Sequence, residues 1–403
     1  MVEKLYLRGP AIAVLCGWLI VQSIFVQGAP FVPASDNQVL ERLRTTPLTL
    51  ADRELRALRA QNRQHPDDLA TALDVARRLI EKSRTEADPR HLGYAESALG
   101  LWWDEPQPPI EVLLLRATIK QSQHDFTNAL ADLELVIRLA SRNGQAWLTR
   151  ATILTVMGQY SEARRACLSL AQVAPGLVAL TATASVICLN GESERGLVLL
   201  RNTLAGNSAA SVTEKLWALT VMAEVATRRG QAADAEEYFK RASALGRRDP
   251  YLLGAYADFL LDQGRARDAA NLLENETRAD GLLLRLALTE SALVPRPPDF
   301  DAHVATLRAR FEAGHLRGET VHQREEARFN LHLLKQPQPA LRLAQANWQV
   351  QREPADARIL LEAALAAGDP AAAKPALDFI RTNRLEDVAL TKLANQLNAD
   401  GTR

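Results

Sequence analysis

The chain has 403 residues, of which 47% are apolar and 24% charged, a balance typical of a folded protein and not of a disordered one. Its 48 basic and 48 acidic residues cancel, so no net positive field draws it toward nucleic acid or an anionic membrane surface. Composition therefore argues against nucleic acid as the main partner and leaves a globular or repeat protein.

Residues 1–34 have the layout of a secretory signal. Lys4 and Arg8 precede a mostly apolar run over residues 11–26, and a stretch rich in Gly, Ala and Pro follows. The apolar run is shorter than the ~20 residues that a membrane-spanning helix usually needs. We therefore expect an exported protein, which is periplasmic if the signal is cleaved. If the signal is kept, residues 11–26 would anchor the protein in the inner membrane, facing the periplasm.

Residues 35–109 are predicted to hold N-terminal helices and a divergent first repeat. Thr49 and Asp52 have the spacing of an N-terminal cap for a helix over residues 50–61. Two further helical stretches, residues 67–84 and 89–103, are predicted to form a helix pair with a longer turn.

Between residues 110 and 280 the sequence repeats with a regular period, which matches the unit length of a known class of helical repeats. Arg-Ala-Thr-Ile at residues 116–119 returns at residues 150–153, and the Ala223, Gly230 and Ala235 pattern recurs one period later. The central glycine can take the left-handed conformation that ends a helix, so each unit reads as helix, tight turn, helix. Small residues flank each turn, where they let two helix axes approach closely. These seam alanines are Ala151 and Ala163, Ala223 and Ala235, and Ala257 and Ala269.

This pattern resembles the tetratricopeptide repeat family of helical hairpins. In the best-matching unit the family positions are filled by Trp147, Ala151, Gly158, Tyr160, Ala163 and Pro175. The resemblance implies an all-α fold, a right-handed solenoid of antiparallel helix pairs. It also implies that the first helices of successive units line a concave groove that binds a peptide or another protein, without performing chemistry.

Two cysteines lie beyond residue 34, Cys167 and Cys188. Both occupy apolar helical positions, where a buried thiol is the simpler interpretation. In an oxidising compartment they could instead form a disulfide. Cys167 also stands where the family usually has a large aromatic residue.

The repeat pattern is lost after Gly281. Residues 281–325 are predicted to form an irregular helical insertion, and residues 326–403 to return to helix pairs and end on a capping helix. Within the insertion, residues 300–313 form an amphipathic stretch. Thr320 and Gln323 have the spacing of a cap for the helix that follows.

Histidines and carboxylates gather in this region and offer a possible site. Glu325 and Glu326 could serve as an acid and base pair, but two carboxylates early in a helix also favour its dipole, and we predict that structural role. Four histidines cluster here, but two of them belong to different helices, so we predict no metal site. They are His303, His315, His322 and His332.

The sequence contains none of the common hydrolase, metalloprotease, phosphate-loop, dinucleotide or CxxC signatures. We therefore predict a protein that is not an enzyme and needs no cofactor. The alternative hypothesis is an envelope enzyme with its site in residues 281–325.

The predicted binding surface consists of two rows on the concave side of the first helices. The residues that follow each seam alanine form one row, and those one turn later form the other. The early units present hydroxyl and small apolar groups and the late units mainly acidic ones, with Arg228 partly neutralised by Glu224. We expect a partner protein segment that is neutral at one end and basic at the other, in envelope or cell-surface assembly. The rows are Thr118, Thr152, Ser185, Glu224 and Asp258, then Ser122, Val156, Leu189, Arg228 and Asp262.

Overall fold

The computed structural model describes residues 35, 49–207 and 209–400. All the described helices belong to one compact unit, Thr46–Arg403. The predicted signal or anchor over residues 1–34 lies outside the described residues. None of the described helices is both long enough and apolar enough to span a membrane.

Within residues 49–109 the structure has four helices before the repeats, and the first is capped as the sequence predicts. The Asp52 amide donates to the Thr49 hydroxyl oxygen at 3.1 Å, and the Thr49 amide donates back to the Asp52 carboxylate at 3.1 Å. This reciprocal capping box satisfies two amides that the helix itself leaves without partners. The N-terminal helices are α1 (Leu50–Gln64), α2 (Leu69–Glu86), α3 (Arg90–Ala98) and α4 (Gly100–Trp103).

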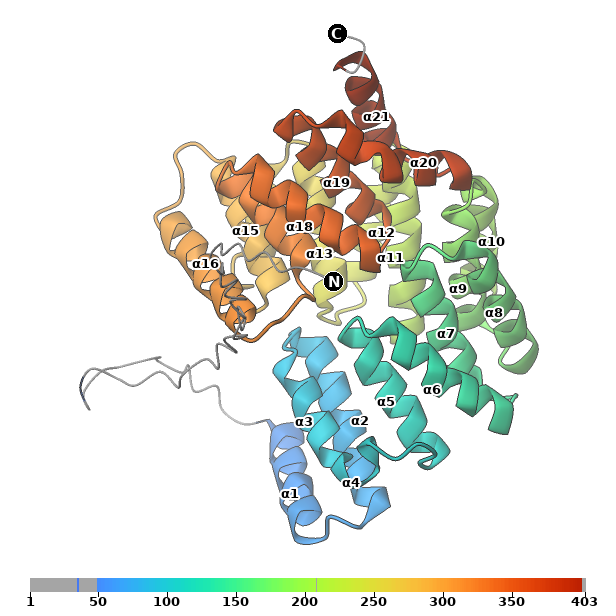
Figure 1. Cartoon of the computed structure of the whole chain (residues 1–403). Helices are drawn as coiled ribbons and strands as arrows, with labels where there is room; N and C mark the ends of the chain where they lie inside the picture. The colour runs from blue at the N-terminus through green and yellow to red at the C-terminus, as the bar shows by residue number, and fades with distance from the viewer. Residues whose placement is uncertain (1–34, 36–48, 208, 401–403) are drawn as a thin grey trace, which may run out of the picture. The chain divides into compact units, whose positions relative to one another are not determined.

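The repeat region forms five antiparallel helix pairs (Figure 1). The first helices of the pairs, α5, α7, α9, α11 and α13, contact one another in sequence order, and each also packs against the second helix of its own pair. The ten helices are α5 (Ile110–Ser122), α6 (Phe126–Leu139), α7 (Gly144–Val156), α8 (Tyr160–Val173), α9 (Leu177–Cys188), α10 (Ser193–Gly206), α11 (Val212–Arg228), α12 (Ala232–Ser243), α13 (Pro250–Asp262) and α14 (Ala266–Leu273).

The turns within these pairs use the left-handed conformation that the glycines permit. Gly158, Gly230 and Gly264 have φ of +73°, +72° and +71°. Each turn places the second helix antiparallel to the first, and the seam alanines are at most 1% exposed. Gly196 replaces a seam alanine in the pair of α9 and α10, because a Cβ there would lie 2.1 Å from the Cys188 sulfur. The predicted repeat packing is thereby confirmed.

Helix pairing continues through the region where the sequence loses its period. Helix α15 packs on α13 and pairs with α16, and π-helix η1 packs on α15. Helix α16 runs three residues past its predicted end. Helix α17 begins at Gln323 after His322 and has no side-chain cap, so the predicted Thr320 cap is wrong. The elements are α15 (Asp280–Ser291), α16 (Phe300–Leu316), α17 (Gln323–Arg328) and η1 (Phe329–Leu333).

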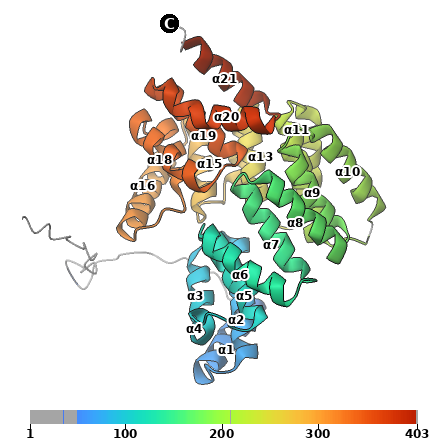
Figure 2. The same cartoon turned by 45° about the vertical axis from the view of Figure 1, so that its right-hand side comes forward.

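The C-terminal helices pack against α7, α8 and α9 of the repeat region (Figures 1 and 2). One buried cluster joins Leu154 and Tyr160 from α7 and α8 to Leu361 and Leu390 from α19 and α21. Aromatic contacts tie the same parts together, since Phe379 lies 5.7 Å from the Tyr160 ring. The elements are α18 (Pro337–Val350), α19 (Pro354–Ala367), η2 (Pro370–Ala373), α20 (Lys374–Asn383) and α21 (Val388–Asp400).

Both cysteines are buried free thiols, as the simpler interpretation predicts. Burial raises the pKa of Cys167 and of Cys188 to about 11, so neither is a reactive thiolate near neutral pH. The described chain is an all-α solenoid of antiparallel helix pairs without a strand, and the predicted fold class is confirmed.

Candidate partner-binding surface

The predicted surface residues lie on successive first helices, two on each of α5, α7, α9, α11 and α13 or directly after them. Side chains that stand one period apart in the sequence lie side by side on neighbouring helices, because each repeat stacks on the one before. The ten residues do not share one environment. The environment of the residues on α5 and in the middle of α7 differs from that of the residues that contact the C-terminal helices.

The hydroxyl groups of the early units are bound by their own helices. Thr118, Ser122 and Thr152 each donate to the carbonyl four residues earlier, at 2.8, 3.0 and 3.0 Å. Ser185 does the same at 2.9 Å. Because each hydroxyl hydrogen is used within its own helix, these side chains offer a partner acceptor oxygens and, on the two threonines, methyl groups. Thr152 is exposed and the other three are half-buried.

The C-terminal helices cover the ends of α7 and α9. The Arg352 amide donates to the Val156 carbonyl at 2.8 Å. Leu189 is only 9% exposed and belongs to the buried cluster that includes α19 and α21. The chain itself therefore occupies this stretch of the predicted groove.

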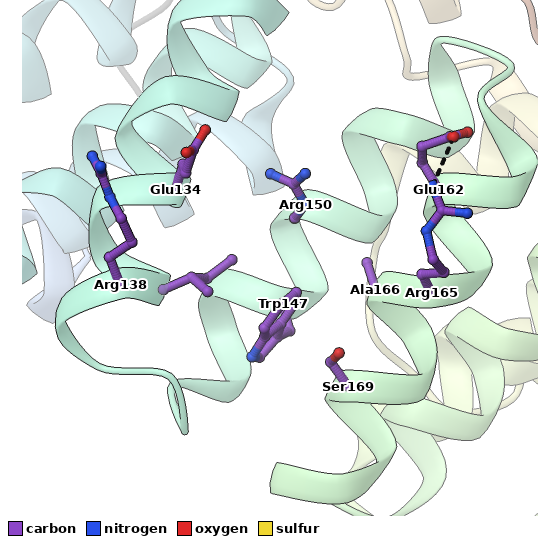
Figure 3. Close-up of a pocket in the computed structure, with 9 residues that line it drawn as sticks. Glu134, Arg138, Trp147, Arg150, Glu162, Arg165, Ala166 and Ser169 are labelled. Atoms are coloured by element: carbon purple, nitrogen blue, oxygen red, sulfur yellow. Dashed lines mark hydrogen bonds and ion pairs between the residues drawn. The ribbon is translucent and has the colours of Figure 1, made fainter.

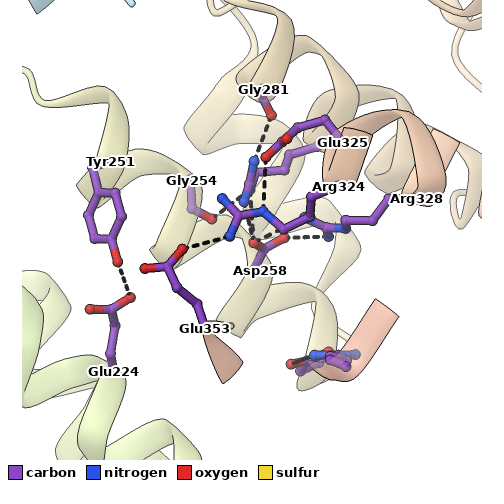
Figure 4. Close-up of polar contacts among 12 residues, drawn as sticks. Glu224, Tyr251, Gly254, Asp258, Gly281, Arg324, Glu325, Arg328 and Glu353 are labelled. Atoms are coloured by element: carbon purple, nitrogen blue, oxygen red, sulfur yellow. Dashed lines mark hydrogen bonds and ion pairs between the residues drawn. The ribbon is translucent and has the colours of Figure 1, made fainter. Parts of the chain in front are cut away.

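Asp258 on α13 is held between two arginines from later helices (Figure 4). Its carboxylate accepts from Arg285 at 2.7 Å and from Arg328 at 2.8 Å. Burial acts to raise the pKa of Asp258, but the two guanidinium charges outweigh it and hold the pKa well below its usual range. Asp258 is therefore ionised and already paired within the chain.

Asp262 has a similar partner one turn further along α13. Arg358 on α19 donates two hydrogen bonds to its carboxylate, at 2.7 and 2.8 Å. Arg358 also donates to Glu362 at 2.7 Å, and His332 lies 3.0 Å from the same carboxylate. Burial alone would raise the pKa of Glu362, but His332 and Arg358 lower it to about 2. The basic groups expected of a partner at this end are supplied by the chain's own C-terminal helices.

Glu224 on α11 interacts chiefly with an aromatic residue that sequence reasoning did not assign to the surface. The Tyr251 hydroxyl, at the start of α13, donates to Glu224 at 2.7 Å (Figure 4). Burial raises the pKa of Glu224, and Arg228 opposes the rise through its charge without forming an ion pair among the described residues. The Tyr251 side chain remains 62% exposed. Tyr251 lies one repeat period after Trp217, and this spacing is the sequence signal that could have identified it.

A polar cluster centred on Arg324 joins α17 to α19. Arg324 donates to Glu353 at 2.8 Å and to Asp356 at 3.3 Å. Asn347 donates to Asp356 at 2.8 Å. Burial raises the pKa of Asp356 to about 6, against the lowering effect of Arg324. This cluster fixes how α17, α18 and α19 pack.

His124 brings the first repeat into contact with the C-terminal helices. It lies one period before Gly158 and takes the same turn position with φ of +61°. Gln351 lies 3.2 Å from its ring nitrogen. Burial and the Arg324 charge lower the pKa of His124 to about 4, so the imidazole is neutral near neutral pH. Sequence reasoning missed this residue, although the period points to it.

The residues that an enzyme site in 281–325 would use do not form one group, because each is paired with a different neighbour. His303 pairs with Glu290 at 2.9 Å and His315 with Glu326 at 2.8 Å. Burial would raise the pKa of Glu325, but Arg324 and Arg285 lower it to about 2, so it is ionised at any ordinary pH. No observation on the described residues favours the enzyme alternative.

The described residues bring together one group with the geometry of metal ligands, Glu86, Asp88 and His91. Lys82 donates to Glu86 at 2.5 Å and Arg90 to Asp88 at 2.7 Å. Both carboxylates thus already have a cation as partner, and the group is an ion-pair cluster at the end of α2.

Paired helices with seam alanines, turn glycines and a regular sequence period define a tetratricopeptide-like protein. No family model matches the chain, and no curated protein matches it in sequence. Solved structures do resemble it. PilW, described as a widely conserved type IV pilus biogenesis factor, is 19% identical over 50% of this chain and 94% of its own, with a TM-score of 0.40.

Two further solved structures cover more of this chain. A tetratricopeptide repeat protein from Parabacteroides merdae is 17% identical over 72% of this chain and 98% of its own, with a TM-score of 0.36. Yeast Tom70 is 11% identical over 87% of this chain and 96% of its own, with a TM-score of 0.34. These are likenesses of fold and assign no partner to this chain.

Proposed function

We propose that the chain is a non-enzymatic scaffold that binds a partner protein through the part of its concave face that its own C-terminal helices leave uncovered. The observation that carries this proposal is the division of the predicted surface. Asp258 and Asp262 are paired with arginines of later helices, whereas the hydroxyls of Thr118 and Thr152 bond to carbonyls of their own helices and Thr152 is exposed.

The chemistry of the uncovered part suits a neutral segment. Its hydroxyl donors are used within α5 and α7, so methyl groups and acceptor oxygens remain for a partner. A peptide or helix with small apolar side chains and free amide or hydroxyl donors complements such a surface. The basic end that the sequence predicted for the partner is not required, because Arg328 and Arg358 already meet the acidic residues.

The signal-like layout of residues 1–34 supports export, and we propose that the scaffold works in the envelope or at the cell surface. A periplasmic location or an inner-membrane tether through residues 11–26 fits this proposal. A fusion of the full chain to a phosphatase that is active only after export tests it. Activity without the fusion's own signal is expected, and an inactive, stable fusion would contradict export.

The binding surface is tested by photo-crosslinking in the native host. A photoreactive phenylalanine replaces Thr152 on the concave face or, as a control, Glu237 on α12, which is 62% exposed in its side chain. We expect one prominent adduct from position 152 and none of that size from position 237. The adduct should disappear when Thr118→Arg is added and persist with Glu237→Arg. An adduct unaffected by Thr118→Arg would place the partner elsewhere.

A further inference from the structure

A cavity lies between the second helices of two neighbouring repeats, α6 and α8 (Figure 3). Its volume is about 410 Å³, which falls within the ~300–1,000 Å³ typical of ligand pockets. Trp147 on α7 lines the cavity between Ile137 of α6 and Ala166 of α8. Three consecutive helices thus contribute to an apolar floor that is separate from the concave rows.

The loop between α6 and α7 holds the tryptophan in place. The Trp147 indole nitrogen donates to the Ser141 carbonyl at 2.8 Å. Asn143 caps α7 by accepting from the Ala146 amide at 3.0 Å, which fixes the start of the helix that carries the ring. The ring is half-buried, so one part packs on the core and another faces the cavity. Ordered, partly exposed tryptophans are prominent among the residues that dominate binding at protein interfaces.

The charges around this floor are unevenly paired. Arg165 donates to Glu162 at 2.8 Å and is neutralised by it (Figure 3). Among the described residues, no carboxylate lies within ion-pair distance of Arg138 or Arg150, both of which line the cavity. Glu134 also lines it and is likewise without an ion pair in the described chain. Two guanidinium groups against one carboxylate leave an excess of positive charge.

We propose that this cavity binds an acidic peptide segment of a partner protein. A large apolar side chain of the segment packs on Trp147, and a neighbouring carboxylate accepts hydrogen bonds from Arg138 and Arg150. Guanidinium groups bind carboxylates with two parallel hydrogen bonds, and the pair is stronger beside an apolar surface than in open water. A basic segment would instead bring like charges together. This site is independent of the concave surface proposed above.

A random peptide library displayed on phage tests the proposal against the full-length chain. The Ser169→Trp variant serves for counter-selection, because its side chain fills the cavity without adding charge. The neighbouring Leu168 is 58% exposed on the same helix, so Leu168→Trp is the matched control. We expect enrichment of peptides with a large apolar residue next to Asp or Glu. A selected peptide should bind the wild type and Leu168→Trp alike, and Ser169→Trp at least about tenfold more weakly.

Charge is tested with the same synthetic peptide. Arg138→Glu with Arg150→Glu should weaken binding at least about tenfold at low salt, whereas Arg142→Glu, in the exposed loop before α7, should change it little. Circular dichroism confirms that each variant is folded. A basic consensus, no enrichment over the filled variant, or equal binding by the double variant would each overturn the proposal. Self-association of the wild type that Ser169→Trp abolishes would identify a second copy as the occupant and overturn it too.

Discussion

Small residues at the seams set how closely the paired helices approach. Ala235 on α12 has no exposed surface, whereas Ala233 two residues earlier is exposed. We expect Ala235→Leu to lower the free energy of unfolding by about 1–3 kcal/mol, because the larger side chain must push α11 and α12 apart. Urea denaturation measures the change, with Ala233→Leu as the control. Equal midpoints for the two variants would contradict the seam packing.

The neutral His124 makes part of the stability depend on pH. Its folded pKa of about 4 lies below the ordinary value of 6.5, so the unfolded chain takes up the proton first. Stability contributed by the neutral ring is therefore complete above about pH 6.5 and is lost as pH falls toward 4. Asp356, with its pKa raised to about 6, acts in the opposite direction between about pH 6 and 4, since its folded state binds the proton more tightly.

The His124→Asn variant isolates the histidine term, because asparagine tolerates the left-handed turn and does not titrate. We expect the stability of the wild type relative to this variant to fall by at most about 3 kcal/mol between pH 6.5 and 4. Denaturation midpoints across that range supply the measurement. A difference that stays constant with pH would show that His124 does not titrate in the expected direction.

Residue-scale features were predictable where the sequence period expressed them. The roles of Gly158 and of the seam alanines could be predicted from residue type and spacing. Glycine readily takes the left-handed conformation of the turn, and only a small side chain fits at the seam. His124 has the same turn position, but histidine takes a left-handed conformation far less often than glycine does. Only its distance from Gly158 indicated the role.

At the scale of helices, ion pairs hold α17 and α19 to α13, and no local sequence pattern predicts these pairs. Asp258 and Arg328 are 70 residues apart, and Asp262 and Arg358 are 96 apart. The sequence identified both aspartates as concave and predicted a basic partner for them. It could not show that the partner residues lie in the same chain, because such pairs depend on how the solenoid curves.

Breaking one of these pairs should weaken the attachment of α17 to α13. Asp258→Asn leaves Arg285 and Arg328 without their shared carboxylate, at a site where the Asp258 side chain is only 29% exposed. We expect a loss of about 1–3 kcal/mol in the free energy of unfolding, less than for a fully buried pair because some water remains. Asp234→Asn, on an exposed stretch of α12, is the control, and thermal denaturation is the measurement. If both variants matched the wild type, the pair would not stabilise the fold.

At the scale of the whole described chain, a solenoid in which each repeat touches only its neighbours would keep its concave face open. This chain departs from that arrangement, since α18 to α21 share a buried cluster with α7 to α9. The sequence period predicted the helix pairs of α5 to α14. It could not predict this closure, because small rotations between repeats add up along the chain and have no signature in any single repeat.

The contact between the C-terminal helices and α7 to α9 should protect both regions against local unfolding. Phe379 on α20 packs against Tyr160 of α8 and lies 5.4 Å from the Trp348 ring. We expect Phe379→Ala to speed amide hydrogen exchange at the turn around Gly158 as well as in α18 and α20, because a half-buried phenylalanine contributes about 2 kcal/mol to the shared contact. Hydrogen exchange followed by mass spectrometry measures it. Phe311→Ala, in the separate cluster that contains Phe329, is the control and should leave the Gly158 turn unchanged. If exchange in the Phe379 variant rose only within α18 to α20, the C-terminal helices would not support the array, and the concave face would behave as an open groove.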